Sequence, residues 1–467
     1  MYASFLESRT EAARELVRRL SGRYEYVSLL GKLVTGKSIA VTTFQTHMSD
    51  TREKQCGFVV KLFTGKVYSE YSFDDITPET IDALEQKIIG NAAINPTLLE
   101  RVCDLSAMAD EPLKKDFRRP LEGREFSTEE CLERLGEIKN AMASVSDKVI
   151  QASASLSQYE TSALFLTKNR ELTQNYTWVG VSCMAVARSE KGMQNYYTPF
   201  ASDSYEQSFA AALEGCRRVA QTAVDLLDAT AIEPGYYEII TEPSITGLIA
   251  HEAFGHGVEM DMFVKNRAKS VHYLNKPVAS PLVEMHDGAA ACLSAGSYFF
   301  DDDGVLAHDT LIIKDGILQT GISDAVSALQ LGTDPTGNGR RESTRRKAYT
   351  RMTNTFFAPR ADKVEDMIAS VKHGYLLAQT SNGMEDPKNW NIQCVCMYGR
   401  EIKDGKFTGK LVAPVVMSGY VPDLLMSITM VSDSSTVIGS GHCGKGYKET
   451  VAVADGGPYL KGRCKLG

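Results

Sequence analysis

Residues 204–235, SYEQSFAAALEGCRRVAQTAVDLLDATAIEPG, decide how the chain is divided, because a long helical pattern here ends in a proline–glycine break. Apolar residues recur at helical spacing from Ser204 to about Ala229. The residues that set this spacing are Phe209, Leu213, Cys216, Ala220, Val224 and Leu227. Pro234 and Gly235 do not continue the helix, since proline lacks an amide hydrogen and glycine favours turns. We therefore predict two domains, at residues 1–232 and 233–467.

The residues before this boundary predict a mixed α/β domain. Residues 24–71 and 161–197 are rich in Val, Thr, Phe and Tyr with polar interruptions, a composition typical of several strands. Thr77-Pro78 is expected to open a short helix that Gly90 closes. A further helix is expected after Ser127, because Glu130 three residues later completes a capping-box pattern.

The residues after the boundary predict a strand-rich domain that carries one functional helix, starting near Pro243-Ser244. Residues 311–318 and 401–407 each place Asp-Gly between apolar runs, which is a hairpin signal. The run Asp301-Asp302-Asp303-Gly304 lacks the spacing of a calcium loop, so we favour an acidic turn. The predicted fold class is therefore α/β in the broad α+β sense.

Composition restricts the kind of protein. A chain of 467 residues is too long for one hydrophobic core, and 43% hydrophobic with 24% charged residues is typical of a soluble globular protein. A net charge of −8 argues against nucleic-acid binding, which favours a basic surface. The first twenty residues interleave charged and apolar side chains, so we expect neither a signal peptide nor a membrane anchor. We predict a cytoplasmic protein.

The ten cysteines are scattered along the chain, and we interpret most of them as buried thiols. Cys394-Val395-Cys396 is the pair that could suggest a metal or redox site. It lies in a strand-like run in which alternation places both thiols on one face. We predict that neither cysteine binds metal and that they form no disulfide with each other.

The segment His251-Glu252-Ala253-Phe254-Gly255-His256 carries the residue types of a hydrolytic metal site. Imidazole nitrogens bind zinc, and an adjacent carboxylate can take a proton from a water molecule. On an ideal helix, residues five apart lie roughly 140° from each other, so a shared metal requires a distortion such as a π-bulge. Gly255 and Gly257 would supply the backbone freedom for it. The alternative is two ordinary histidines near a helix end.

A second segment, Ser440-Gly441-His442-Cys443-Gly444-Lys445-Gly446, supplies a further candidate ligand. Cys443 is a potential thiolate in a glycine-rich turn, where a metal can approach closely. Catalytic zinc sites use three protein ligands and keep a fourth position open. His251, His256 and Cys443 would make such a set, with Glu252 as the catalytic acid/base.

Two polar segments are candidates for substrate contacts. Residues 335–341, PTGNGRR, form a glycine-punctuated loop that lacks the ending of a phosphate-binding P-loop. Residues 351–355, RMTNT, bring several hydrogen-bonding side chains together. The two interpretations are a solvated loop with a polar strand, or contacts to a substrate backbone near the metal. The candidate binding residues are Arg340, Arg341, Arg351 and Asn354.

Taken together, these segments resemble the TldD branch of the TldD/PmbA family. Residues 251–261 resemble its H-E-x-x-x-H signature, residues 335–341 its P-T-G-N-G-R-R loop, residues 351–355 its R-M-T-N-T segment, and residues 443–445 its C-G-K. The resemblance implies a zinc-dependent protease in which His251, His256 and Cys443 bind Zn2+ and Glu252 is the acid/base. The family also carries the label of modulators of DNA gyrase.

The resemblance further implies short or unfolded peptides as substrates, held in extended form in a closed cleft. It implies a heterodimer with a metal-free paralogue of the same fold, and a homodimer is the alternative. Thr350 departs from the family pattern, where proline commonly precedes the arginine. His442 beside Cys443 is a second possible ligand, although thiolate chemistry and the matching C-G-K favour Cys443.

The chemistry of such a site predicts peptide-bond hydrolysis. The metal activates water, and Glu252 accepts the proton and returns it to the leaving amine. Strand addition would hold extended peptides through main-chain hydrogen bonds with little regard to side chains. Two alternatives stay open, namely a non-catalytic assembly partner or regulator and a metal amidase acting on small molecules. The intact Glu252 and the complete ligand set argue against the first.

Overall fold

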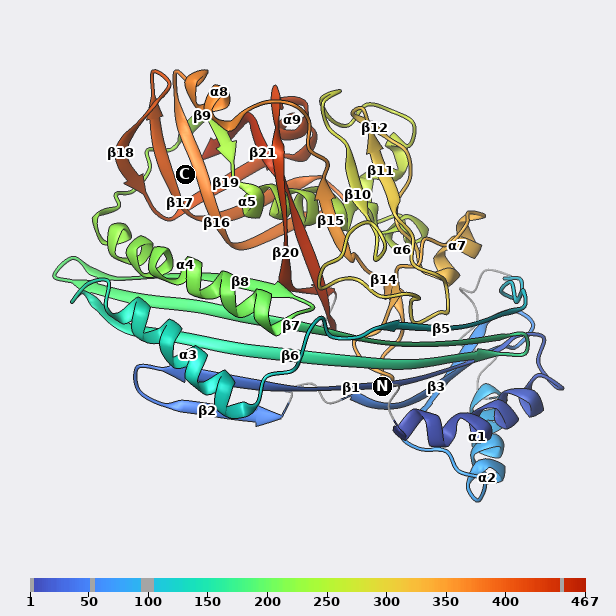
Figure 1. The fold of residues 1–467 in the computed structure, drawn as a ribbon. Coiled ribbons are helices and arrows are strands. Elements are labelled where there is room, and N and C mark those ends of the chain that lie inside the picture. Colours follow the sequence, from blue (N-terminus) through green and yellow to red (C-terminus); the bar gives the residue numbers. More distant parts are fainter. Residues whose placement is uncertain (1–3, 51–54, 94–104, 446–448) are drawn as a thin grey trace.

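The computed structural model describes residues 4–50, 55–93, 105–445 and 449–467, and it contains two large β-sheets with helices packed on them (Figure 1). The first sheet is built from residues before 203 and the second from residues after 234. The predicted mixed α+β fold class is confirmed. The chain enters the second sheet at Gly235, where its first strand begins. The division into domains at residues 232 and 233 stays a prediction.

The first sheet has the strand order β4-β3-β1-β6-β7-β5, with β2 paired to β1 and β8 paired to β7. Its strands are β1 Val27–Thr42, β2 Thr46–Asp50, β3 Gln55–Phe63, β4 Tyr68–Phe73, β5 Leu113–Arg119, β6 Val149–Thr167, β7 Arg170–Ser189 and β8 Gly192–Ser202. All pairs are antiparallel except β5 with β7. The second half of the chain lies against the sheet that contains the long β6–β7 pair (Figure 1).

Helices cover two regions of the first sheet. These helices are α1 Ser4–Leu20, α2 Ile81–Ala93, α3 Thr128–Ala143 and α4 Tyr205–Asp225, which continues as a 3-10 turn over Leu226–Asp228. α3 and α4 pack on the face of β6 and β7 that presents Leu156, Val179 and Val181. Strand alternation therefore turns Ser157 and Trp178 toward the second half. α1 and α2 pack beside β1 and β3.

Local capping signals were confirmed where they are strongest. Ser127 accepts a hydrogen bond from the backbone of Glu130, and the Glu130 carboxylate accepts one from the backbone of Ser127. The helix predicted to start at Pro78 begins instead at Ile81, because residues 77–80 form a separate hydrogen-bonded turn. It also passes Gly90 and reaches Ala93, since a glycine inside a helix weakens it without ending it.

The second sheet has the order β12-β11-β10-β15-β21-β19-β17-β16-β9, with β18 paired to β17 and β20 paired to β21. Its strands are β9 Gly235–Thr241, β10 Met285–Asp287, β11 Thr310–Lys314, β12 Ile317–Leu318, β15 Asn354–Phe357, β16 His373–Asp386, β17 Asn391–Lys403, β18 Lys406–Val412, β19 Val415–Tyr420, β20 Met430–Lys445 and β21 Glu449–Leu466. β9 pairs with both β16 and β21, so five strands close into a ring. A small separate pair joins β13 Gly339–Arg340 to β14 Tyr349–Thr350.

The two Asp-Gly hairpins are confirmed. Asp315-Gly316 joins β11 to β12, and Asp404-Gly405 joins β17 to β18. All four residues have positive φ, between 46° and 79°, which is the conformation that a tight two-residue turn requires.

Short helices complete the second half. They are α5 Pro243–Leu248, a π-helix over Ile249–Gly255, a 3-10 turn over His256–Val258, α6 Met260–Val264, a 3-10 turn over Lys269–Tyr273, α7 Ala325–Leu331, α8 Val364–Ala369 and α9 Val421–Met426. α5 and the π-helix pack against β16 and β21 within the main core of this half. Within the described ranges, no helix is long and apolar enough to cross a membrane.

Buried ion pairs join the two halves. The acidic run at Asp301–Asp303 forms a turn, as predicted, and its carboxylates meet lysines of the first sheet. Lys32 lies 3.0 Å from Asp302, and Lys61 is paired with Asp303. Arg341 lies 2.6 Å from Glu70 of β4. The β20–β21 hairpin adds a second connection, because it reaches across to β8 (Figure 1).

Candidate metal centre

The helix that carries both histidines widens between them, as predicted. α5 starts with Pro243 in its first turn and gives way to a π-helix over Ile249–Gly255. The backbone amide of His256 donates to the carbonyl of His251, which is the i to i+5 hydrogen bond of a π-turn. Residues five apart thereby come to the same side, which a regular α-helix would not allow.

At Gly255 and Gly257, the absence of a side chain matters more than the backbone conformation. Gly255 has φ −60°, an ordinary helical value, so the prediction that it supplies backbone freedom was wrong. A Cβ at this position would lie 2.2 Å from the sulfur of Met352. A Cβ at Gly257 would lie 2.7 Å from a carboxylate oxygen of Glu385. A methyl group at either position would require the side chain of Met352 or Glu385 to shift, because these side chains occupy that space.

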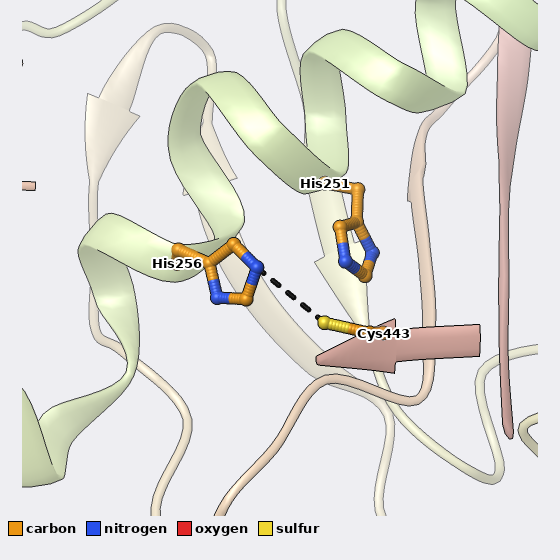
Figure 2. A group of neighbouring side chains, drawn as sticks. All are labelled: His251, His256 and Cys443. Carbon is orange, nitrogen blue, oxygen red and sulfur yellow. Dashed lines mark hydrogen bonds between the residues drawn. The ribbon is translucent and has the colours of Figure 1, made fainter. Parts of the chain in front are cut away.

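His251, His256 and Cys443 converge, although Cys443 is far away in sequence (Figure 2). One ligand atom from each residue lies within 4.8 Å of the other two. Nε2 of His256 is 3.4 Å from Sγ of Cys443, and the two imidazole planes are nearly perpendicular at 87°. His251 and Cys443 are each 5% exposed, so the group is buried. Cys443 lies near the end of strand β20, so its predicted place in a turn was wrong.

Glu259 sets the orientation of the His256 ring. Its carboxylate lies 3.2 Å from Nδ1 of His256 and 3.0 Å from Nζ of Lys445. Burial by itself would raise the pKa of Glu259, but Lys445 and His256 lower it to about 2. The ionised carboxylate holds a ring hydrogen on Nδ1, so Nε2 is the ring nitrogen that faces Cys443. Carboxylate partners of this kind orient histidine ligands in metal sites.

Cys443 lies in an environment that favours the thiolate. Burial opposes ionisation, but His251 and His256 lower the pKa of the thiol to about 4. The thiolate is the form of cysteine that binds metal. Arg351 donates from Nη2 to the Cys443 carbonyl at 2.5 Å and so fixes this part of β20. His442 is exposed, and strand alternation turns it to the opposite face, away from the two histidines.

Glu252 lies beside the group without belonging to it. One carboxylate oxygen is 3.8 Å from Nε2 of His251, and the other is 3.9 Å from Nε2 of His256. Burial raises its pKa, and the two histidines oppose that rise only in part. Gly383 of β16 lies directly beneath it, since a Cβ there would be 2.8 Å from Cγ of Glu252.

The donor set fits a zinc-like ion. Two imidazoles and a thiolate are ligands that zinc prefers, and three protein ligands leave a position open. Nε2 of His251 and Nε2 of His256 lie 3.8 Å and 3.9 Å from the Glu252 carboxylate, so both imidazoles turn the same ring nitrogen toward the group. A metal held among these residues would therefore fit the local chemistry.

Two of the four candidate substrate-binding residues, Arg340 and Arg341, line an open cavity. Arg340 is partly exposed there, whereas Arg341 is 3% exposed, Arg351 1% and Asn354 0%. Arg341 pairs with Glu70, Arg351 supports Cys443, and the Asn354 amide donates to the carbonyl of Cys292 at 3.0 Å. These three hold the protein together, so we assign them no substrate contact. The alternative of a polar strand at residues 351–355 is confirmed in part, because β15 begins at Asn354, although the whole segment is buried.

Cys394 and Cys396 lie on one face of β17 and are fully buried. Both are free thiols, as predicted, and neither belongs to the metal-ligand group found in the described residues. Sequence reasoning missed Glu259, Lys445 and Glu385 around the site. The position of Glu259, three residues after His256 in a helical segment, is the one signal that could have indicated it.

Comparison with known proteins identifies a class of metallopeptidases. Residues 122–229 match the model of the PmbA/TldA metallopeptidase central domain, and residues 234–459 match that of the corresponding C-terminal domain. The chain belongs to the PmbA/TldD family.

Relatives in the same family carry metalloprotease names. A metalloprotease of Synechocystis is 28% identical over 356 residues, which are 75% of this chain and 76% of the relative. A zinc metalloprotease TldD homologue of Saccharolobus solfataricus is 29% identical, over 51% of this chain and 53% of the relative.

Two solved structures share the fold. A Thermotoga maritima protein, solved as a candidate modulator of DNA gyrase, superimposes with a TM-score of 0.78 at 15% identity, over 98% of this chain and all of that one. TldE of Thermococcus kodakarensis gives 0.75 at 16% identity, over 98% and 100% of the two chains.

Proposed function

We propose that this protein is a zinc-dependent peptidase that hydrolyses short or unfolded peptides. The observation that carries the proposal is the convergence of His251, His256 and Cys443 within 4.8 Å, with the Glu252 carboxylate beside both histidines. The metalloprotease names of its relatives support the reaction class, and one of those names specifies zinc.

Each residue of the site has a defined task in this proposal. His251, His256 and Cys443 hold the ion, while Glu259 and Arg351 keep His256 and Cys443 in position. A zinc ion supplies Lewis acidity and lowers the pKa of a water molecule. Glu252 accepts the proton of the attacking water and returns it to the leaving amine. Its raised pKa suits this exchange, because a proton carrier works best near the operating pH.

The edge of β16 supports an extended peptide as the substrate. β17 pairs with β16 along one edge, but β9 pairs with the other edge only from Gly374 to Leu377. Among the described residues, no strand pairs with that second edge over residues 382–386, and Gly383 in this stretch touches Glu252. An incoming peptide that adds as a strand here would run past the acid/base. Main-chain pairing would make cleavage insensitive to most side chains.

Metal analysis combined with a peptide-cleavage assay tests the proposal. Wild-type protein should contain zinc and cleave unfolded peptides, while folded proteins resist. Glu252→Gln should keep its metal but lose roughly 10²–10⁴-fold in rate, the usual effect of removing a proton acceptor. Glu238→Gln is a matched control, because Glu238 pairs with Lys461 outside the metal-ligand group.

Two outcomes would favour the alternatives. If Glu252→Gln cleaves peptides at the wild-type rate, the mechanism is excluded and an assembly partner or regulator becomes the leading interpretation. If the zinc-loaded protein cleaves only small amides, the metal amidase leads. Pairing with a metal-free paralogue or with a second copy stays a prediction.

A further inference from the structure

A second candidate site lies on the other side of β20 from the metal ligands. It is a cavity of about 380 Å³ between the polar face of the first sheet and the β20–β21 hairpin. Ser157, Trp178 and Tyr197 line it from the first sheet, and Tyr298, Arg340 and His442 line it from the second half. His442 directly precedes Cys443, and Val451, which pairs with Cys443 in the hairpin, also lines the cavity. None of His251, His256 and Cys443 lines the cavity, so it is adjacent to the metal centre but separate from it.

Arg340 is the charged residue of this cavity that lacks an ion-pair partner among the described residues. Lys32 and Arg341 also line it, but they pair with Asp302 and Glu70. Glu342, the single carboxylate of the described lining, has Arg346 3.5 Å away. Among the described residues, Arg340 has no ion pair. One of its nitrogens, Nη1, donates to the Met352 carbonyl at 2.7 Å, so its other N–H groups remain available for a ligand.

The guanidinium of Arg340 is held in place for binding. It lies over the ring of Tyr298 with 5.4 Å between the guanidinium carbon and the ring centroid. Stacking on an aromatic face and one fixed hydrogen bond restrict the side chain without neutralising it. A guanidinium arranged in this way matches the two oxygens of a carboxylate.

The neighbouring rings favour a ligand that also carries an apolar group. Trp178 donates from its indole nitrogen to the Gly439 carbonyl at 3.0 Å, which fixes its ring in the cavity wall. Tyr197 donates to the Thr380 carbonyl of β16 at 2.9 Å. Thr380 stands just before the unpaired stretch of β16, so Tyr197 links the cavity to the edge where a peptide would add.

We propose that this cavity binds the carboxylate-bearing end of a peptide, with Arg340 as the carboxylate anchor and the rings of Trp178 and Tyr298 receiving the last side chain. The proposal rests on the proposed peptidase function and extends it to the choice of substrate. Peptides with a free C-terminal carboxylate are preferred over peptides whose C-terminus is an amide. Arg340 is a positioning residue, because it contacts the peptide end and takes no part in bond cleavage.

Calorimetric titration of the Glu252→Gln protein tests binding without cleavage. The probes are one unstructured hexapeptide ending in leucine, its C-terminal amide, and the amide with glutamate as the last residue. The free acid should bind about tenfold or more tightly than the plain amide, the usual effect of a charge-assisted hydrogen bond. If the amide ending in glutamate binds as tightly as the free acid, Arg340 also accepts a side-chain carboxylate. If it binds as weakly as the plain amide, Arg340 recognises the C-terminal carboxylate.

Variants of Arg340 complete the test. Arg340→Gln should bind acid and amide equally, and Arg340→Lys should keep part of the preference. Arg345→Gln is the control, because Arg345 pairs with Asp74 on the exposed surface. In active protein, Arg340→Gln should raise KM for free acids and leave kcat nearly unchanged. Melting temperatures of all variants exclude misfolding as the cause.

Failure of this proposal is distinguishable from failure of the peptidase proposal. Equal binding of acid and amide by the folded Glu252→Gln protein overturns the role of the cavity, even if peptides are cleaved. If binding depends on Arg340 but the protein cleaves no peptide, the proposed role of the cavity is supported and the proposed peptidase function is refuted.

Discussion

The Glu259 carboxylate lies 3.2 Å from Nδ1 of His256, on the side of the ring that faces away from Cys443. Nε2 of the same ring lies 3.4 Å from Sγ of Cys443. The same carboxylate contacts Lys445 at 3.0 Å, and Lys445 is two residues beyond Cys443 on β20. Glu259 thus connects the histidine helix to the strand that carries the thiolate. This connection explains how ligands from distant parts of the sequence keep one geometry.

The first prediction is that Glu259→Gln weakens metal binding. Loss of the negative charge makes Nε2 a poorer donor and frees the ring, so zinc affinity should fall on the order of 10–100-fold. Chelator competition measures the affinity, and a melting curve of the metal-free variant measures the fold separately. Asp309→Asn is the matched control, since Asp309 contacts Nδ1 of His286 at 2.8 Å outside the metal-ligand group. Unchanged zinc affinity in Glu259→Gln would show that the carboxylate does not support the ligand.

The second prediction separates the adjacent residues His442 and Cys443. Cys443→Ala and His256→Ala should lose bound zinc and peptidase activity together, because each removes one of three ligands. His442→Ala should keep its zinc, since its side chain lies on the opposite face of β20 and lines the second cavity. Elemental analysis after dialysis measures the zinc content of each variant and so shows whether His442 or Cys443 is the ligand. Zinc loss in His442→Ala would mean that the ligand assignment on β20 is wrong.

The sequence predicted well those features that depend on neighbouring residues. The capping box at Ser127, the Asp-Gly hairpins and the long helix over residues 204–229 are determined by short-range hydrogen bonds and turn geometry. The spacing of His251 and His256 also required a widened helix, and a π-turn is present. These features follow from the chain's local chemistry, so a single sequence is enough to predict them.

Features that depend on distant contacts could not be predicted in this way. The closure of β9 against both β16 and β21 joins segments far apart in the chain, and no local signal encodes it. Arg351 and Asn354 look like solvated or binding residues in the sequence because they are polar. They are buried, and their partners come from other loops and strands. Burial of a polar side chain becomes visible only when its hydrogen-bond partners are known.

The third prediction concerns the ion pair between Glu70 and Arg341, which joins the two halves at 2.6 Å. Burial alone would raise the pKa of Glu70, but Arg341 and Lys61 lower it from 4.5 to about 2. Because the folded pKa is the lower one, the stabilisation is complete above the unfolded pKa and disappears as the pH falls toward 2. Glu70→Gln should therefore cost on the order of 3 kcal/mol near neutral pH, since it leaves a buried guanidinium unpaired.

Urea unfolding of wild type and Glu70→Gln at several pH values measures this difference. The gap between the two midpoints should be constant at neutral pH and shrink progressively below about pH 4.5, the ordinary pKa of glutamate. Asp74→Asn is the control, because the Asp74–Arg345 pair is exposed and such pairs contribute little. A gap that persists unchanged at the lowest pH would assign the effect to packing instead of charge.

The last prediction concerns how the peptide lies on β16. A strand that adds to an edge directs every second amide toward that edge, while the intervening amides point away. Two N-methylated versions of one unfolded peptide therefore differ in effect, one carrying methyl groups on the odd amides and the other on the even amides. In the Glu252→Gln protein, one version should bind roughly tenfold or more weakly than the unmodified peptide, because it loses several main-chain hydrogen bonds. The other version should bind almost normally. Equal weakening by both versions would indicate steric exclusion, and no weakening by either would show that the peptide is held by its side chains and not by the edge of β16.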